Sequence, residues 1–197
     1  MNLPNKITVS RIILAILILI LLVFPWYQVG IEFPKYVIKG NILIDLKYII
    51  AGILFVIASV TDFIDGHLAR KHNLVTDFGK VMDAIADKVL VNGLLVILAC
   101  NGFISVVVPV VIITRDIFVD SIKMVAGSKK GAVGASWTGK VKTICMMVGL
   151  SLVMFYNLPF ELLNVRVADI LILAATILSV VSGCQYYLNN KDVFANK

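Results

Sequence analysis

Four aspartates lie close together in the sequence, between two long apolar runs. Asp62 and Asp65 are three residues apart, and Asp83 and Asp87 are four residues apart. On a helix, both spacings put the two side chains of a pair on the same face. A centrally placed Asp costs roughly 2.5–3.5 kcal/mol to insert into a membrane, so four at one depth require partners. The obvious partners are divalent cations.

The aspartates predict a site for hard metal ions. Carboxylate oxygens prefer Mg²⁺, Mn²⁺ or Ca²⁺, and no His or Cys is spaced to favour zinc. If the helices that carry the two pairs are antiparallel neighbours, all four carboxylates converge on one point. Two divalent cations there would balance the four negative charges. Two metals roughly 3.5–4 Å apart can clamp phosphoryl oxygens and stabilise a leaving group.

The residues between the aspartates fit a site that a ligand approaches closely. Small residues let a ligand or a neighbouring backbone come near. Three of them accompany the aspartates: Gly66, Ala69 and Gly79. Arg70 is available for a phosphate group. The structural alternative is an ion-pair network of the aspartates with Arg70, Lys80 and Lys88.

The composition is that of an all-α integral membrane protein. The 197 residues are 60% hydrophobic and only 15% charged, with a mean hydropathy of +0.98. A soluble domain averages roughly 45–50% apolar and about 25% charged residues. The net charge of +6 suggests contact with anionic lipid headgroups or phosphorylated substrates. No arginine-rich, aromatic-interleaved segment supports nucleic-acid binding.

The apolar runs predict six transmembrane helices in one membrane domain, residues 1–197. An N-terminal interfacial helix, residues 1–11, precedes the six-span bundle of residues 12–188, and residues 189–197 form a polar tail. The first apolar run lacks a small-residue cleavage site, so we expect it to be retained as a span. The predicted spans cover residues 12–26, 48–64, 80–99, 104–125, 138–156 and 167–188, with a loop at 66–79. Of the 18 Lys and Arg residues, 14 fall on the side that holds both termini and the aspartates, which is therefore expected to be cytoplasmic.

The aspartate segment resembles the signature of the CDP-alcohol phosphotransferase family. The matching string is Asp62-x2-Asp65-Gly66-x2-Ala69-Arg70-x8-Gly79-x3-Asp83-x3-Asp87. All eight fixed positions are present at the right spacing. The resemblance implies a six-span membrane enzyme, a homodimer, and two divalent cations, Mg²⁺ or Mn²⁺.

The resemblance also implies a role for each motif residue. Asp62, Asp65 and Asp83 would be metal ligands, and Asp87 would be a ligand, the base for the acceptor hydroxyl, or both. The CDP part of the donor would be held by Asp62, Gly66, Ala69, Arg70 and Gly79.

Two further segments resemble the branch of this family that makes phosphatidylglycerophosphate from CDP-diacylglycerol and glycerol-3-phosphate. The first is the opening NLPNKITVSRI, in which Asn5 and Thr8 would help to hold the nucleotide. The second holds Arg115, Asp116 and Lys123, followed by the run GKVKT at 139–143. Two residues depart from the branch, which usually has Glu at 116 and Arg at 123, although the sign of the charge is kept.

Cations in the second half of the chain predict a phosphorylated acceptor, because a phosphate needs such partners. They are Arg115, Lys123, Lys140 and Lys142. Glycerol-3-phosphate is the expected acceptor, and inositol phosphate, serine and phosphatidylglycerol are the alternatives. Asp116 and Asp120 could instead pair with Arg115 and Lys123 without any substrate. Two other classes are a divalent-cation transporter and a non-catalytic lipid-binding scaffold.

Overall fold

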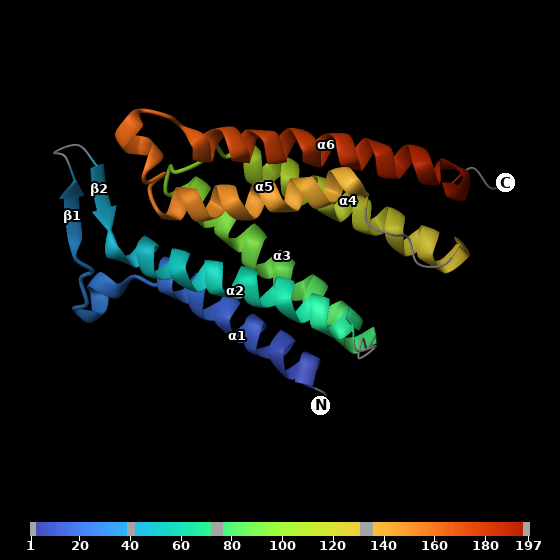
Figure 1. Cartoon of the computed structure of the whole chain (residues 1–197), viewed down its shortest axis with the longest axis horizontal. Helices are drawn as coiled ribbons and strands as arrows, with labels where there is room; N and C mark the ends of the chain where they lie inside the picture. Colours follow the sequence, from blue (N-terminus) through green and yellow to red (C-terminus); the bar gives the residue numbers. More distant parts are fainter. Residues whose placement is uncertain (1–2, 39–41, 72–76, 131–135, 195–197) are drawn as a thin grey trace.

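The computed structural model describes the backbone of residues 3–38, 42–71, 77–130 and 136–194 (Figure 1). The side chains of the same ranges are described, apart from those at 3–7, 63–71, 77–78, 80, 128–130 and 192–194.

Six long helices make up most of the described chain, which confirms the prediction of an all-helical protein. They are α1 (Leu3–Val23), α2 (Leu46–Lys71), α3 (Asp77–Cys100), α4 (Val107–Lys130), α5 (Trp137–Met154) and α6 (Val167–Phe194). Two short 3₁₀ helices lie in the connections, at Trp26–Val29 and Phe160–Leu163.

Several features differ from the sequence prediction, among them the predicted tail at 189–197, whose first part continues α6 to Phe194. Helix α2 continues to Lys71, through the first half of the predicted loop at 66–79. Good helix formers such as Leu68 and Ala69 follow Gly66, and one glycine costs only about 1 kcal/mol in a helix. The predicted interfacial helix and first span form one continuous helix, α1 (Leu3–Val23). The one potential helix breaker in this range is Pro4, which is tolerated because it lies in the first turn. The region expected as a loop before α2 contains an antiparallel hairpin, β1 (Lys35–Ile38) and β2 (Ile42–Asp45).

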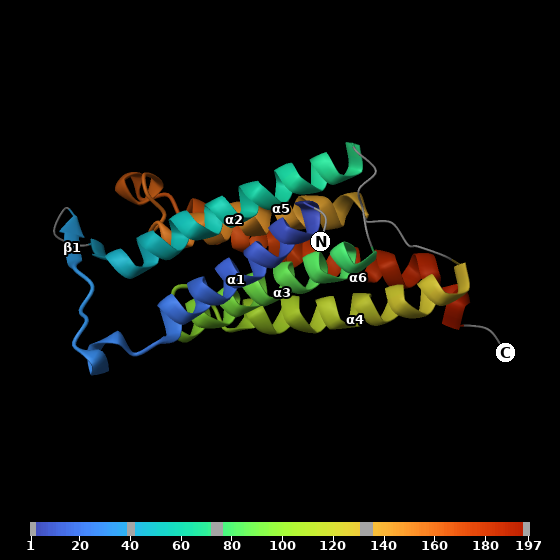
Figure 2. The ribbon, with the colours of Figure 1, turned by 90° about the horizontal axis from the view of Figure 1, so that it is seen from below.

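The helices run roughly along the long axis of the molecule (Figures 1 and 2). Helix α1 packs against α2 and α3, and α6 packs against α4 and α5. Helix α5 also contacts α2, which joins the two groups. The hairpin and the α5–α6 connection lie at one end, whereas the N-terminus and the last turns of α2 lie at the other (Figure 1).

Apolar side chains fill the centre of the bundle and also cover its outside. Phe55, Leu94 and Leu150 are completely buried. Large apolar residues such as Leu17 on α1 and Leu173 on α6 are more than half exposed. Within the described residues, one helical segment, Val167–Lys191, is long and apolar enough by composition alone to cross a membrane, with a mean hydropathy of 2.2.

Candidate active site

The aspartates of α2 and α3 converge on one cationic side chain of α1. Arg11 forms an ion pair with Asp62 of α2 through its Nη1 atom. The same Nη1 lies 3.3 Å from Oδ1 of Asp83 on α3. Oγ1 of Thr8 donates a hydrogen bond of 2.8 Å to the same oxygen of Asp83. The predicted convergence of carboxylates from two neighbouring helices is therefore present for Asp62 and Asp83.

The sequence reasoning missed Arg11. Its side chain is only 5% exposed, although it stands at the start of an apolar run, where a cation is expected to lie at the cytoplasmic face. A signal was available, because Arg11 follows Thr8 by three residues and therefore shares its helix face. The structure turns this face toward the aspartates.

Several predicted site residues lie outside the described side chains. Asp65, Gly66, Ala69 and Arg70 are on the last turns of α2, and Asn5 is on the first turn of α1. Gly79 is half-buried on the first turn of α3. Among the described side chains, no group of three or more His, Cys, Asp or Glu is placed to hold a metal ion.

Asp87 follows Asp83 by one turn of α3. It lines a cavity of about 300 Å³ between α3, α4, α5 and α6. We call this the cationic cavity, after the charged residues that line it together with Asp87: Lys88, Arg115, Asp116, Asp120, Lys123 and Lys142. Four cationic groups thus face three carboxylates. The cavity brings Asp87 together with three of the cations predicted for an acceptor phosphate.

A single carboxylate organises two of these cations. Asp116 Oδ1 accepts a hydrogen bond of 2.8 Å from Arg115 and another of 3.0 Å from Lys142. All three side chains are less than one-fifth exposed. Because hydrogen bonds between ionised groups are short and strong, this trio holds Lys142 in place at the wall of the cavity.

Arg115 is anchored to α6. Its Nε donates to the backbone carbonyl of Ser179 at 3.0 Å, and its Nη2 donates to Oγ of Ser182 at 2.6 Å. Gly183 makes room for the stem, since a Cβ there would lie 3.1 Å from Cγ of Arg115. Arg115 therefore holds Asp116 in position through its bonds to α6. Lys123 and Lys142 line the same cavity and can contact a ligand more readily.

The other charged residues of α4 and α5 differ in their surroundings. Asp120 pairs with Lys88 of α3 rather than with Lys123. The Nζ of Lys123 lies 5.1 Å from the ring centroid of Tyr186. Lys140 is exposed and does not line the cationic cavity. It precedes Lys142 by two residues, which puts it on another face of α5.

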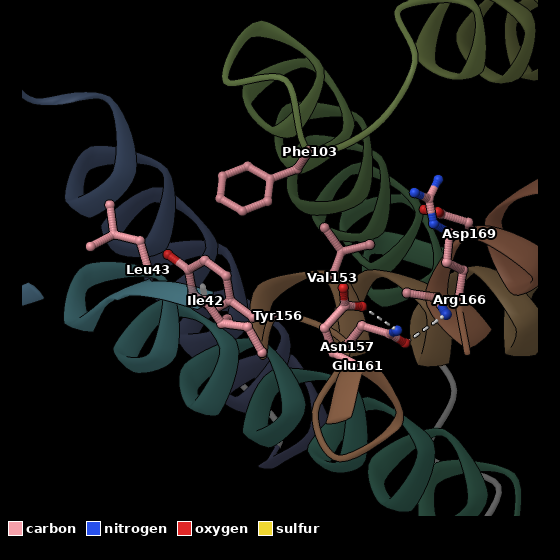
Figure 3. A pocket seen from close by; sticks show the side chains of 10 residues that line it. Ile42, Leu43, Phe103, Val153, Tyr156, Asn157, Glu161, Arg166 and Asp169 are labelled. Carbon is pink, nitrogen blue, oxygen red and sulfur yellow. Dashed lines mark hydrogen bonds between the residues drawn. The ribbon is translucent and has the colours of Figure 1, made fainter. Parts of the chain in front are cut away.

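A second cavity, of about 350 Å³, lies at the hairpin end of the bundle (Figure 3). Its wall is braced by Asn157, which donates to Oε2 of Glu161 at 2.9 Å and accepts from the backbone N–H of Ala168 at 3.0 Å. Arg166 and Asp169 stand at its rim. Asn157 also donates to the backbone carbonyl of Val165 at 2.7 Å, so its part in this cavity is to hold the α5–α6 connection together.

Comparison with known proteins decides the family. A family model described as CDP-alcohol phosphatidyltransferase matches residues 1–181, a stretch that contains the four aspartates and all the charged residues that line the cationic cavity. The chain belongs to the CDP-alcohol phosphatidyltransferase family. As a member of that family it is an enzyme, a transferase of phospholipid biosynthesis.

Several curated members of the CDP-alcohol phosphatidyltransferase family are similar to this chain over most of its length. A protein of Bacillus subtilis is 38% identical over 189 residues, which are 96% of this chain and 95% of the relative. A protein of Rickettsia bellii is 32% identical over 194 residues, covering 98% and 97%. A protein of Mycoplasma genitalium is 39% identical over 149 residues, covering 76% and 63%. All three are named CDP-diacylglycerol–glycerol-3-phosphate 3-phosphatidyltransferase.

Proposed function

We propose that this enzyme transfers a phosphatidyl group from CDP-diacylglycerol to glycerol-3-phosphate, giving phosphatidylglycerophosphate and CMP. The observation that carries the proposal is the cationic cavity, in which a carboxylate, Asp87, faces Lys123 and Lys142. In such a lining the lysines can bind a phosphate, and the carboxylate can take a proton from a hydroxyl. The names of the similar proteins support the same donor and acceptor.

The acceptor phosphate would bind at Lys123 and Lys142, with Arg115 positioning Asp116 behind them. Lysine ammonium groups donate strong, charge-assisted hydrogen bonds to phosphate oxygens. The excess of cations over carboxylates in the lining favours an acceptor with its own negative charge over a neutral alcohol. Inositol phosphate shares this chemistry and is the second candidate acceptor.

The aspartates fit the divalent cations on which this family depends. Asp62 and Asp83 approach a common positive group, the Arg11 guanidinium, from two helices, and carboxylate oxygens are the ligands that Mg²⁺ and Mn²⁺ prefer. We expect two such cations to be held by Asp62, Asp65, Asp83 and Asp87. When bound, they would neutralise the donor pyrophosphate and stabilise the charge on the departing CMP. The nucleotide would be held by Asn5, Thr8, Asp62, Gly66, Ala69, Arg70 and Gly79.

The chain's own part in the transfer is to orient the acceptor and to take its proton. The acceptor oxygen forms a bond to the phosphorus that carries diacylglycerol, and the bond from that phosphorus to the CMP oxygen breaks. The electron pair of the broken bond leaves with CMP. The hydroxyl proton passes to the Asp87 carboxylate, which acts as general base.

We place the enzyme in the bacterial cytoplasmic membrane as a multi-pass protein and, as the family resemblance implies, a homodimer. The apolar side chains on the outside of the helices suit contact with lipid. The acyl chains of the donor would remain in the bilayer, and the aspartates would face the cytoplasm.

The test is CMP release by Asp83→Asn and Asp87→Asn, with and without Mg²⁺ or Mn²⁺. A general base contributes about 10²- to 10⁴-fold to a rate, so Asp87→Asn should lose at least about 10²-fold in kcat and stay folded. Retained turnover in both variants would refute the proposal.

A further inference from the structure

The polar face of α1 is built onto the aspartates. Thr8 and Arg11 are each 5% exposed, and both contact Asp83. One turn further on, the same helix buries apolar side chains, Ala15 and Ile18, against the rest of the bundle. Helix α1 therefore holds Arg11 firmly between α2 and α3 rather than presenting it to solvent.

Arg11 provides what two approaching carboxylates require. Asp62 and Asp83 come from different helices, and their like charges would push those helices apart. The guanidinium bridges both, because its Nη1 is shared between them. A guanidinium stays charged at any pH at which the protein is folded, so it cannot release the carboxylates by losing a proton. It can release them only by moving.

We propose that Arg11 is a resident counter-cation of the aspartate site. It offsets part of the negative charge of Asp62 and Asp83 while no divalent cation is bound, and it competes with a divalent cation for the same two carboxylates. Arg11 is thus a positioning residue that sets the affinity of the site. The inference rests on the metal-binding part of the proposed function.

If Arg11 is a counter-cation, its replacement should have opposite effects on the stability of the metal-free protein and on its affinity for a divalent cation. A purely structural arginine would affect stability alone. Without a divalent cation, replacing Arg11 by an uncharged residue removes a positive charge that both carboxylates contact, and the fold should loosen. With a divalent cation, the same change removes a competitor, and binding should tighten. One neighbouring unit charge changes a carboxylate's affinity for a proton by about 10- to 1,000-fold, and a divalent cation feels the same charge at least as strongly. The dissociation constant should therefore fall by about tenfold or more.

The experiment measures Mn²⁺ binding to the full-length protein in detergent micelles, from the electron paramagnetic resonance signal of free Mn²⁺. Arg11→Met removes the charge and keeps much of the stem. Arg11→Lys keeps the charge. Arg166→Met is the matched control, because it removes an exposed arginine of the α5–α6 connection, which lines the second cavity instead of contacting the aspartates.

We expect Arg11→Met to bind Mn²⁺ about tenfold or more tightly than the wild type does. Arg11→Lys should stay within about threefold, since its charge still opposes the ion, and Arg166→Met should match the wild type. In EDTA, Arg11→Met should unfold at a lower temperature than the wild type, and saturating Mn²⁺ should close the gap. If Arg11→Met does not fold in EDTA, Mn²⁺ should restore its folding.

Unchanged or weaker Mn²⁺ binding by a folded Arg11→Met would overturn the inference, as would a misfolded Arg11→Met that Mn²⁺ does not rescue. These outcomes leave the proposed function untouched as long as the wild type binds Mn²⁺. A wild type that binds no Mn²⁺ would instead refute the metal-binding role itself.

Discussion

Lys142 offers the sharpest test of the acceptor site. Its ammonium lines the cationic cavity and donates to Asp116 at 3.0 Å. The substitution Lys142→Met removes the charge and keeps a flexible apolar stem that can fill the space. We expect weaker binding of glycerol-3-phosphate, because one charge-assisted hydrogen bond to its phosphate is lost.

The size of the effect follows from the energy of such a bond. Hydrogen bonds to charged groups contribute about 1.5–3 kcal/mol, and each 1.4 kcal/mol corresponds to about a tenfold change in affinity. Part of the Lys142 charge is balanced by Asp116, which moves the expectation toward the lower end. The KM for glycerol-3-phosphate should therefore rise about 10- to 100-fold, while kcat changes little because the lost contact serves both ground state and transition state.

The assay is CMP release in mixed micelles, with each substrate varied while the other is saturating. Lys191→Met is the control, since it removes an exposed lysine from α6, and its constants should equal those of the wild type. Glycerol without a phosphate serves as a second acceptor. The substitution at Lys142 should leave its slow reaction unchanged.

Three results would count against this reasoning. The first is an unchanged KM for glycerol-3-phosphate. The second is an equal rise in the KM for CDP-diacylglycerol, which would point to a general distortion. The third is an equal loss for glycerol, which would show that Lys142 does not act on the phosphate.

Three other changes have distinct expected outcomes. Lys140→Met should alter the KM for glycerol-3-phosphate by less than about threefold in the same assay, because an exposed charge outside the cavity is screened by solvent; a rise equal to that of Lys142→Met would contradict the geometry. Arg115→Lys should lower the melting temperature and raise the KM for the acceptor, because lysine cannot reproduce the separate bonds to Ser179, Ser182 and Asp116; a variant with wild-type melting would show that the anchor is unimportant. Asn157→Ala should lower the free energy of unfolding by about 1–3 kcal/mol, because the buried N–H of Ala168 loses its acceptor. The kcat and KM for CMP release should not change, and a change in either would show that the second cavity and the cationic cavity are not independent.

The helices, and the convergence of Asp62 and Asp83 from neighbouring helices, could be predicted because both follow from local periodicity. Long apolar runs need intrahelical hydrogen bonds, and carboxylates spaced by three or four residues share a face whatever surrounds them. The end of α2 was placed too early because Gly66 and the polar residues after it resemble a turn. In the structure, the helix formers beyond Gly66 carry α2 to Lys71.

Contacts between distant segments were harder to predict, since they depend on how the helices are rotated. The shared helix face of Thr8 and Arg11 could be predicted, but not that α1 turns this face toward Asp62 and Asp83, which lie 51 and 72 residues after Arg11. Lys140 and Lys142 show the opposite case. An offset of two positions places their side chains about 200° apart around a helix, so the sequence alone could have shown that they do not share a face.

The most direct test of the central claim is a comparison of acceptors with CDP-diacylglycerol as the only donor, measured as CMP release by the wild-type protein in the presence of Mg²⁺. Glycerol-3-phosphate, inositol phosphate, serine and phosphatidylglycerol would each be supplied at the same concentration. We expect rapid CMP release and formation of phosphatidylglycerophosphate with glycerol-3-phosphate, and at most slow release with the other three. No CMP release with glycerol-3-phosphate, or faster release with another acceptor, would contradict the proposed reaction.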